Sequence, residues 1–372
     1  MPVRIASLQT FRRDYPVVGH FKFFAGRGDR PPMRETVLVK LTTDDGAAGW
    51  GQCVPSPRWS YETIETVEST LRGYLAPALV GLDPLDGEAI HAAMDHAIAP
   101  SFSTGQPICK AGVDLALFDL AGRMLKQSPA ERWGRQSAES VTLSWTLNPT
   151  SLAAMEADVA EAQRRGYRHF NVKVAPNAAY DLQLLRRLRQ LAPEAIVWAD
   201  ANGGYDLETA LSVAPRLADL GVSALEQPLP AVRLADFARL RKQGALPILM
   251  DEPLVSCDVL REFHQLGLLD GAAIKVSRCG GLSDARRQVE YLLEHGLLFF
   301  GSGLTDPDLS LAASLQLFAA YGLSVPAALN GPQYLSGSVL RTPIQISGDI
   351  AHAPTGPGLG VAVDASKLTA SD

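Results

Sequence analysis

Five charged residues stand at corresponding positions along this chain and could together carry out chemistry. Each ends a short apolar run, and successive runs lie about 25 residues apart. The five are Lys173, Asp200, Glu226, Asp251 and Lys275. Three carboxylates brought together repel one another unless a cation lies between them, and hard divalent cations prefer carboxylate oxygens. Two lysines beside such a site could exchange a proton with a bound substrate.

The spacing of these runs indicates which elements position the five residues. A strand, a helix and two loops take roughly 25 to 30 residues, which is the repeat of a (β/α)8 barrel. The carboxyl ends of all strands in such a barrel meet at one rim, where active sites are built. The sequence therefore predicts an α/β fold whose barrel, over residues 135–335, carries the five charged residues at its mouth.

A smaller domain is predicted before the barrel. Residues 3–11 and 34–42 have the composition of strands in an antiparallel meander, and apolar residues then recur at helical spacing from Tyr61 to about Gln127. We therefore expect an α+β capping domain over residues 1–130. Residues 340–372 contain no further strand–helix unit, and we expect them to return to that domain.

The segment 14–33 is predicted to be a mobile loop that influences specificity. It is rich in Gly, Pro, Arg and Phe and shows no period. Long irregular loops in compact domains are usually lids, binding loops or disordered segments. His20, Lys22 and Arg27 are candidates for contact with a substrate carboxylate, although most charges in such loops are only solvated.

The run that ends at Lys173 is the sharpest local signal. Polar and apolar residues alternate over 169–174, so Asn171 and Lys173 share one face of a strand. The apolar face packs on helices, which leaves the polar face inside the barrel, where a lysine is costly unless it is paired or functional. Taken alone, Lys173 is explained equally well by an ion pair with a neighbouring acid.

The three acids, like Lys173, each have a structural explanation that involves no function. Any one of them is more simply explained as a helix cap or as the partner of an arginine. Three acids on consecutive strands, with a lysine on the strand at either side, instead favour a shared metal site, and open water positions suit Mg²⁺. Lys275 lies about four strands round from Lys173, so the two would face each other across a bound substrate.

Three further residues are candidates for the mouth of the barrel. Asn202 follows Asp200 at the next-but-one position and is expected to orient that ligand or a water molecule. Asp306 either faces the substrate or caps the next helix, and the cap is slightly favoured. Asn330 either reaches the mouth from the eighth strand or holds a turn before Gly331.

The bulk properties limit the classes of function. The chain has 372 residues, of which 47% are hydrophobic and 20% charged, and its net charge is −6. No basic tract stands out, which argues against nucleic acid and anionic membranes as partners. We recognise neither a signal peptide nor an apolar span of ~20 residues, and the four cysteines are scattered, which indicates reduced thiols in a cytoplasmic protein.

In combination, the motifs resemble the enolase superfamily and, within it, the muconate-lactonizing subgroup. The resemblance covers nearly the whole chain, and it rests on GWGQC, KAGVDLALFDLAGR, WTL, VKV, DANGG, LEQPL, MDEP, IKVSRCGGL, LNGP and GPGLG. It implies that Asp200, Glu226 and Asp251 bind one Mg²⁺ and that Lys173 and Lys275 are the acid/base pair. The implied step is abstraction of the proton α to a carboxylate, with the enediolate held on the metal.

The same resemblance implies a small carboxylate substrate, a homo-oligomer and an early loop that closes the site. Two residues depart from the subgroup's pattern. Asn171 stands where the subgroup usually has a lysine, which removes one positive charge beside Lys173. Thr305 stands where many relatives have a glutamate, and the adjacent Asp306 is a candidate to replace it.

Lysines on both faces of the substrate favour racemisation or epimerisation of an amino-acid derivative. The segment ALNGP lacks the pair of aspartates with which dipeptide epimerases hold an ammonium group, which counts against an ordinary dipeptide. The alternatives are muconate-type cycloisomerisation and β-elimination, in which one lysine does the chemistry and the other stabilises charge. A non-catalytic barrel that binds a small acid is a further hypothesis, motivated by Asn171 and Thr305.

Overall fold

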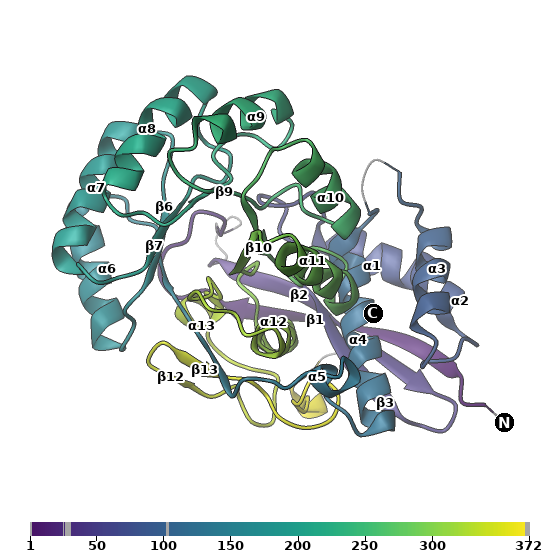
Figure 1. Cartoon of the computed structure of the whole chain (residues 1–372). Helices are drawn as coiled ribbons and strands as arrows, with labels where there is room; N and C mark the ends of the chain where they lie inside the picture. Colours follow the sequence, from purple (N-terminus) through teal and green to yellow (C-terminus); the bar gives the residue numbers. More distant parts are fainter. Residues whose placement is uncertain (1, 25, 27–30, 102–103, 369–372) are drawn as a thin grey trace.

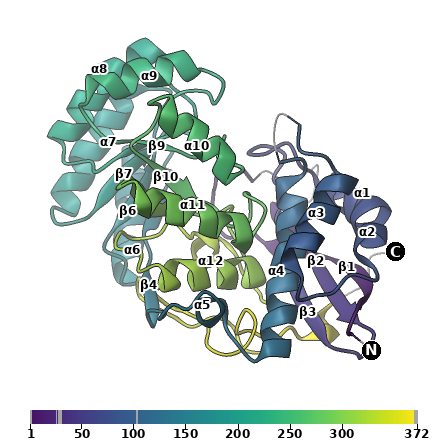
Figure 2. The same ribbon diagram turned by 45° about the vertical axis from the view of Figure 1, so that its right-hand side comes forward.

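The computed structural model of the chain describes residues 2–24, 26, 31–101 and 104–368. A small sheet covered by helices lies beside a ring of parallel strands, which is enclosed by a second set of helices (Figures 1 and 2). One buried apolar cluster lies mostly in the barrel and a second lies mostly in the small part, and each includes residues of the other part at their boundary. None of the helices in the described ranges is long and apolar enough to cross a membrane.

The first part is an antiparallel sheet followed by helices, as the sequence predicts. The sheet has the order β1-β2-β3, with strands β1 (Ile5–Pro16), β2 (Met33–Thr43) and β3 (Ala48–Cys53). The helical elements are α1 (Ile64–Thr70), the π-helical turn η1 (Leu71–Leu75), α2 (Ala76–Leu79), α3 (Gly87–Ala97), α4 (Pro107–Leu125) and α5 (Pro129–Arg132).

Strand β1 is longer than the sequence predicts. It stays paired with β2 as far as Pro16, which lies opposite Met33, so the first residues of the expected loop belong to the sheet. Tyr15 is fully buried there, and its hydroxyl donates a hydrogen bond to Asp308 Oδ2 at 2.6 Å. This bond joins residues almost 300 positions apart, and a local sequence pattern carries no signal for it.

Glycines bring strand β3 into direct backbone contact with α4. A Cβ atom on Gly51 would lie 1.9 Å from the carbonyl oxygen of Gly112. A Cβ atom on Gly49 would lie 2.3 Å from the backbone nitrogen of Leu120. The GWGQ pattern therefore marks a close approach of strand and helix, which only glycine permits.

The second part is a curled parallel sheet, and it confirms the predicted (β/α)8-type barrel. Among the described residues its order is β11-β10-β9-β8-β7-β6-β5. The strands are β5 (Trp145–Leu147), β6 (Phe170–Lys173), β7 (Val197–Asp200), β8 (Leu225–Glu226), β9 (Ile248–Met250), β10 (Gly271–Ile274) and β11 (Leu298–Gly301).

Helices connect these strands and form the outer ring in Figure 1. They are α6 (Leu152–Arg164), α7 (Ala178–Leu191), α8 (Leu207–Asp219), α9 (Leu234–Gln243), α10 (Cys257–Gln265), α11 (Leu282–Glu294), α12 (Asp308–Ala320) and the short α13 (Gly331–Tyr334). The predicted eighth strand is reduced to single bridges. Ala327 bridges Leu143 and Ala328 bridges Ser302, which closes the ring between its first and last strands.

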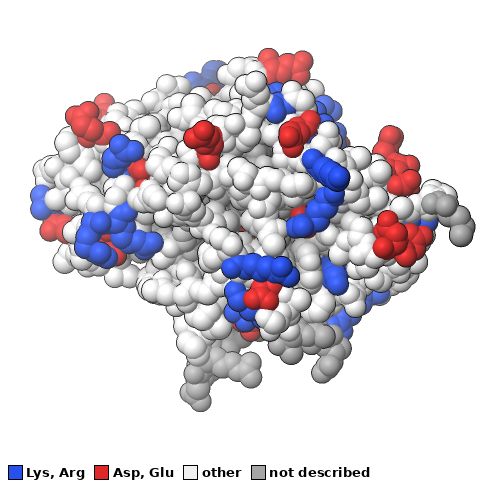
Figure 3. Space-filling view, turned by 90° about the horizontal axis from the view of Figure 1, so that it is seen from below, with Lys and Arg blue, Asp and Glu red and all other residues white. Residues whose placement is uncertain are grey.

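Charged side chains of both signs share the molecular surface. On the face seen in Figure 3, Lys and Arg side chains lie next to Asp and Glu side chains in several places, with uncharged residues between these groups. Exposed ion pairs in the described part of the chain include Arg164 with Glu161 and Arg187 with Glu156. The two signs therefore largely offset each other at the surface.

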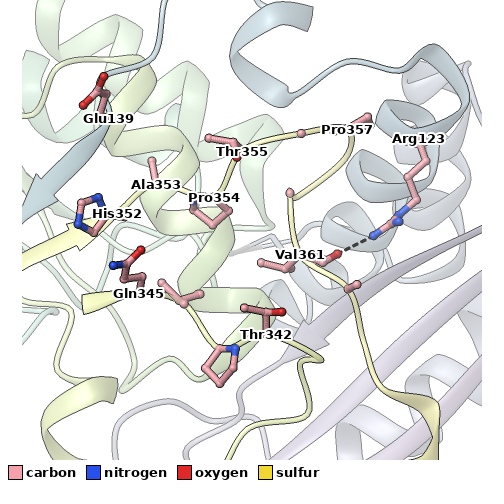
Figure 4. Close-up of a pocket in the computed structure, with 15 residues that line it drawn as sticks. Arg123, Glu139, Thr342, Gln345, His352, Ala353, Pro354, Thr355, Pro357 and Val361 are labelled. Carbon is pink, nitrogen blue, oxygen red and sulfur yellow. Dashed lines mark hydrogen bonds between the residues drawn. The ribbon is translucent and has the colours of Figure 1, made fainter. Parts of the chain in front are cut away.

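The last part of the chain pairs with the barrel's entry segment and then contacts α4. Strands β12 (Ile346–Ser347) and β13 (Ile350–His352) form a small antiparallel sheet with β4 (Ser140–Thr142), and η2 (Ala365–Lys367) follows. Arg123 Nη2 on α4 donates to the carbonyl oxygen of Val361 at 2.7 Å (Figure 4). The exact domain boundaries stay a prediction.

Candidate active site

Strand register places the first charged residues side by side. Lys173 and Asp200 are the last residues of β6 and β7 and are directly paired, and Asp200 is in turn paired with Glu226 at the end of β8. Neighbouring strands lie about 4.8 Å apart, and paired residues of parallel strands project from the same face. Their side chains therefore meet at one rim of the barrel.

Two further residues complete the group from β9 and β10. Asp251 and Lys275 directly follow those strands. One carboxylate oxygen from each of Asp200, Glu226 and Asp251 lies within 4.8 Å of the other two, and all three side chains are buried. The structure thus brings together all five charged residues that the sequence singled out.

The carboxylates have positively charged partners but are incompletely bonded. Lys173 Nζ donates to Asp200 Oδ2 at 2.5 Å, and Lys275 Nζ donates to Asp251 Oδ1. Trp198 Nε1 donates to Glu226 Oε2 at 3.0 Å. Glu226 Oε1 and Asp251 Oδ2 are buried and have no hydrogen-bond partner among the described residues.

Buried carboxylate oxygens without donors are costly, because water and hydrogen-bond partners are both missing. Burial and the neighbouring Asp200 raise the pKa of Glu226 to about 8. A divalent cation held between the three carboxylates would bond the free oxygens and offset the repulsion. The donor set, which is oxygen only, therefore fits a hard divalent metal ion.

The two lysines lie on either side of the carboxylates. Burial alone would lower the pKa of Lys173, but Asp200 and Glu226 outweigh it, and the pKa is raised. Lys275 Nζ lies 3.6 Å from Glu226 Oε1, in addition to its bond with Asp251. The Lys173 ammonium is thus held in the charged form by the acids that surround it.

Arg278 and Glu252 also belong to this group, although the sequence analysis did not select them. Arg278 Nη2 donates to the side chain and to the carbonyl oxygen of Asp251. Glu252 accepts from Asn202 Nδ2 at 3.0 Å, and its pKa is raised to about 7 by burial and by Asp251. Both residues stand inside the quoted motifs MDEP and IKVSRCGGL, so their position next to a candidate ligand was the available signal.

Asn202 lies where the sequence predicted. Its backbone nitrogen donates to Asp200 Oδ1 at 2.8 Å and its side-chain nitrogen to Asp200 Oδ2 at 3.2 Å. Asn202 has a φ of 44°, in the left-handed region that asparagine tolerates. This conformation turns both nitrogens toward the same carboxylate.

Asn171 and Asn330 lie on the wall that β5 and β6 form beside the strand of Asp200. Asn171 is paired in register with Thr146 on β5, and Asn330 Nδ2 donates to the hydroxyl of Thr146 at 3.3 Å. Asn171 Nδ2 and Asn330 Oδ1 are buried without a partner in the described part of the chain. Asn330 therefore contributes to this wall.

The slightly favoured role of Asp306 as a helix cap is wrong. The residue before α12 is Pro307, which makes no side-chain cap. Asp306 is instead buried and accepts a hydrogen bond from Ser277 Oγ at 2.7 Å, and Ser277 follows Lys275 by two residues. Thr305 is also buried, with a φ of 58° and a hydroxyl that has no partner among the described residues.

Aromatic side chains cover the lysines. Trp59 stacks on Phe23 with ring centroids 4.3 Å apart, and Phe21 stacks on Tyr334 at 4.9 Å. The ring centroid of Trp59 lies 5.6 Å from Lys173 Nζ and 5.1 Å from Lys275 Nζ. These four rings form an aromatic roof, which keeps water from the charges below and strengthens their interactions.

The three early-loop candidates have different positions. Lys22 lies in the roof between Phe21 and Phe23, and its charge interacts with those of Lys173 and Asp200. His20 is exposed and lines a separate hollow of about 380 Å³ beside α6. Arg27 lies outside the described residues.

A larger hollow of about 770 Å³ lies elsewhere, between the C-terminal segment and α4 (Figure 4). Arg123, Glu139 and His352 supply its charged and titratable groups, and its lining includes none of the five residues at the barrel mouth. The side chains drawn in Figure 4 do not converge on one point. The candidate active site is therefore the covered mouth, where the five charged residues converge, and not this open hollow.

Comparisons with known proteins agree with this geometry. Residues 154–367 match the sequence profile described as "Enolase C-terminal domain-like". Residues 32–134 match the profile "Mandelate racemase / muconate lactonizing enzyme, N-terminal domain". Together the two profiles span both parts of the fold.

Individual relatives extend over almost the full chain. A chloromuconate cycloisomerase of Cupriavidus necator is 30% identical over 90% of this chain and 91% of its own. An N-succinyl-L-Arg/Lys racemase of Bacillus cereus is 25% identical over 90% of this chain and 89% of its own. The crystal structure of 2-chloromuconate cycloisomerase from Rhodococcus opacus 1CP superposes with a TM-score of 0.89 at 28% identity, and the match covers 98% of each chain.

Proposed function

Because the chain belongs to the mandelate racemase / muconate lactonizing enzyme family of the enolase superfamily, we propose that it is a Mg²⁺-dependent cycloisomerase of an unsaturated dicarboxylate. Cycloisomerases predominate among the relatives reported above. They favour this reaction over racemisation or epimerisation, which the sequence analysis placed first.

The observation that carries the proposal is the alignment of Lys173, Asp200 and Glu226 on adjacent strand ends, with Asp251 and Lys275 closing the far side. We assign the three acids as ligands of one Mg²⁺. The bound ion supplies positive charge where negative charge develops on the substrate's carboxylate. The free oxygens of Glu226 and Asp251 support this assignment.

The lysines hold the proton that the reaction needs. In lactonization, a carboxylate oxygen at one end of the diene forms a C–O bond, and the carbon next to the other carboxylate gains a proton. The dianion and one proton thus give a lactone monoanion. We assign the proton donor as the ammonium of Lys173 or Lys275, which water then reprotonates.

The test uses the purified protein with millimolar Mg²⁺ and a panel of cis,cis-muconate and chloromuconates. We expect the ultraviolet absorbance of the diene to disappear and the lactone to appear by mass. Lys173→Met and Lys275→Met are each expected to lower kcat, by roughly 10²- to 10⁴-fold for the proton donor. Absence of lactone from every diene, with Mg²⁺ bound, would contradict the proposal.

Racemisation of an N-modified amino acid is the second candidate, because the two lysines lie on opposite sides of the carboxylates and one relative is a racemase. Deuterium exchange in D₂O separates the candidates. A racemase exchanges the α-proton of both enantiomers, and each lysine variant keeps exchange for only one of them. A cycloisomerase instead places a single deuterium in the lactone.

A further inference from the structure

A four-residue turn in the early loop carries one positive charge over the candidate active site. Phe21, Lys22, Phe23 and Phe24 form this turn, which is closed by a hydrogen bond from Phe24 N to Phe21 O at 2.9 Å. Its residues Phe21 and Phe23 form half of the aromatic roof, which lies over Lys173 and Lys275. The turn belongs to the capping part of the chain, whereas the charges below it belong to the barrel.

Aromatic contacts on both sides of Lys22 fix the turn. Phe21 stacks on Tyr334 at 4.9 Å, and Lys173 Nζ lies 6.0 Å from the centroid of the same Phe21 ring. Phe23 stacks on Trp59 at 4.3 Å, nearly parallel. The lysine between these two rings is therefore held at the mouth of the barrel, where it is partly buried.

Lys22 has no counter-ion of its own. Among the described residues it makes no ion pair and no hydrogen bond through its side chain, and Nζ lies 5.2 Å from the ring centroid of Phe23. Burial and repulsion from Lys173 lower its pKa to about 8, while Asp200, Glu252 and Glu226 offset part of this shift. The charges that act on Lys22 are thus those of the site.

The remaining charges of the site are already matched. Asp200 and Asp251 pair with Lys173 and Lys275, and Arg278 lies against Asp251 near Glu252. A divalent cation bound beside Glu226 would be neutralised by the Glu226 carboxylate together with one substrate carboxylate. Lys22 then remains as a positive charge without a negative partner.

The rest of the molecule does not attract anions. The chain carries a net charge of −6, and both signs share the surface (Figure 3). On β6, the inward position two residues before Lys173 is the neutral Asn171. A second negative group on a substrate therefore depends on a local cation, and the turn supplies one.

We propose that Lys22 binds a second anionic group of the substrate, so that the site selects dicarboxylates over monocarboxylates. The inference rests on the proposed function for the location of the first carboxylate. It assigns Lys22 as a substrate-binding residue, carried into the site by the capping part of the chain.

The test measures binding of two non-reacting probes by calorimetry, in millimolar Mg²⁺ near pH 7. Hexanedioate carries two carboxylates and hexanoate carries one, on chains of equal length. We expect the wild-type protein to bind hexanedioate at least about tenfold more tightly, which corresponds to roughly 1.4 kcal/mol. Lys22→Met is expected to remove most of this preference and to leave hexanoate affinity unchanged, while Lys22→Arg keeps the preference.

Two control variants isolate the position of the charge. Lys242→Met removes a positive charge from the exposed end of α9, and His20→Ala changes an exposed residue of the same early loop. Both are expected to keep the wild-type preference. Equal affinity of the wild-type protein for the two probes would overturn the proposal, as would an unchanged preference in Lys22→Met.

Failure of the proposed function has a different signature. If the protein prefers hexanedioate through Lys22 but lactonizes no diene, the role of Lys22 stands and the proposed reaction is wrong. If the protein lactonizes muconate and Lys22→Met leaves kcat/KM unchanged, the proposed reaction stands and the proposed role of Lys22 is wrong.

Discussion

Glu226 illustrates at the scale of one residue how the site depends on a cation. It is fully buried, its Oε1 atom lacks a hydrogen-bond partner in the described structure, and its pKa is raised to about 8 by burial and by Asp200. An ionised carboxylate in such surroundings needs a positive partner. Lys275 Nζ lies 3.6 Å from this oxygen and does not hydrogen-bond to it, which supports a metal ion as a further positive group.

Substitution Glu226→Gln is expected to weaken Mg²⁺ binding at least tenfold, because the amide keeps the shape but removes the charge. Calorimetry of the metal alone measures this without reference to activity. Glu252→Gln is the matched control, since Glu252 is also buried but lies outside the group of three converging acids. Equal loss of Mg²⁺ in both variants would argue against the assigned ligand set.

The charge on Lys22 should make turnover of a dicarboxylate substrate depend on pH. Burial disfavours its ammonium form and lowers its pKa to about 8, so Lys22 is charged below that pH and neutral above it. For a dicarboxylate substrate, kcat/KM is expected to fall as the pH rises above about 8. In Lys22→Arg this decrease should move to higher pH, because a guanidinium stays protonated. Superimposable profiles of the two proteins would contradict this explanation.

At the scale of elements, short strands in register do most of the positioning. A shift of one residue between β6 and β7 would place Lys173 and Asp200 on opposite faces of the sheet. In the capping part, the close packing of β3 on α4 is sensitive to added side-chain atoms, because backbone contacts at Gly51 and Gly112 leave no room for a side chain.

Gly51→Ala is accordingly expected to destabilise the fold by about 1–3 kcal/mol, because its Cβ would overlap the carbonyl of Gly112. Urea-induced unfolding measures the difference. Gly73→Ala is the control: it is exposed within η1, and its Cβ would meet nothing within 4 Å. That change should be neutral or stabilise by up to about 1 kcal/mol. An equal loss of unfolding free energy in both variants would show that overlap with the carbonyl of Gly112 is not the cause of the destabilisation.

At the scale of the whole molecule, single buried side chains join segments far apart in the sequence. Asp119 on α4 accepts hydrogen bonds from Trp50 N, Leu359 N and Arg123 Nε at 2.9 to 3.0 Å. It thereby connects β3, α4 and the C-terminal segment. Tyr15 and Asp308 form a similar connection between the first strand and the barrel.

Asp119→Ala is expected to lower the free energy of unfolding by roughly 3 kcal/mol, because it leaves buried donors without an acceptor. Asp219→Ala, at the exposed end of α8, removes the same charge and should change stability by less than about 0.5 kcal/mol. Thermal and urea unfolding of both variants provide the comparison. A loss for Asp119→Ala no larger than that control would show that the three bonds contribute little to holding the segments together.

The sequence by itself determined the barrel, the family and the group of five charged residues. It could do so because apolar runs of regular spacing predict parallel strands, and because the ends of such strands must share one rim. The racemase or epimerase prediction was less successful, since lysines on two faces are compatible with several reactions and the relatives favour cycloisomerisation.

Only the tertiary structure decided which other residues join the site. Arg278, Glu252 and Trp59 reach the mouth from loops and from the capping part, where no period marks them. The structure also decided that Lys22, and not the exposed His20, is the early-loop candidate at the mouth. The length of β1 and the contact of Asp306 with Ser277 likewise depend on partners remote in the chain. Local patterns report which face of an element is buried, whereas the pairing of side chains from different elements exists only after the chain has folded.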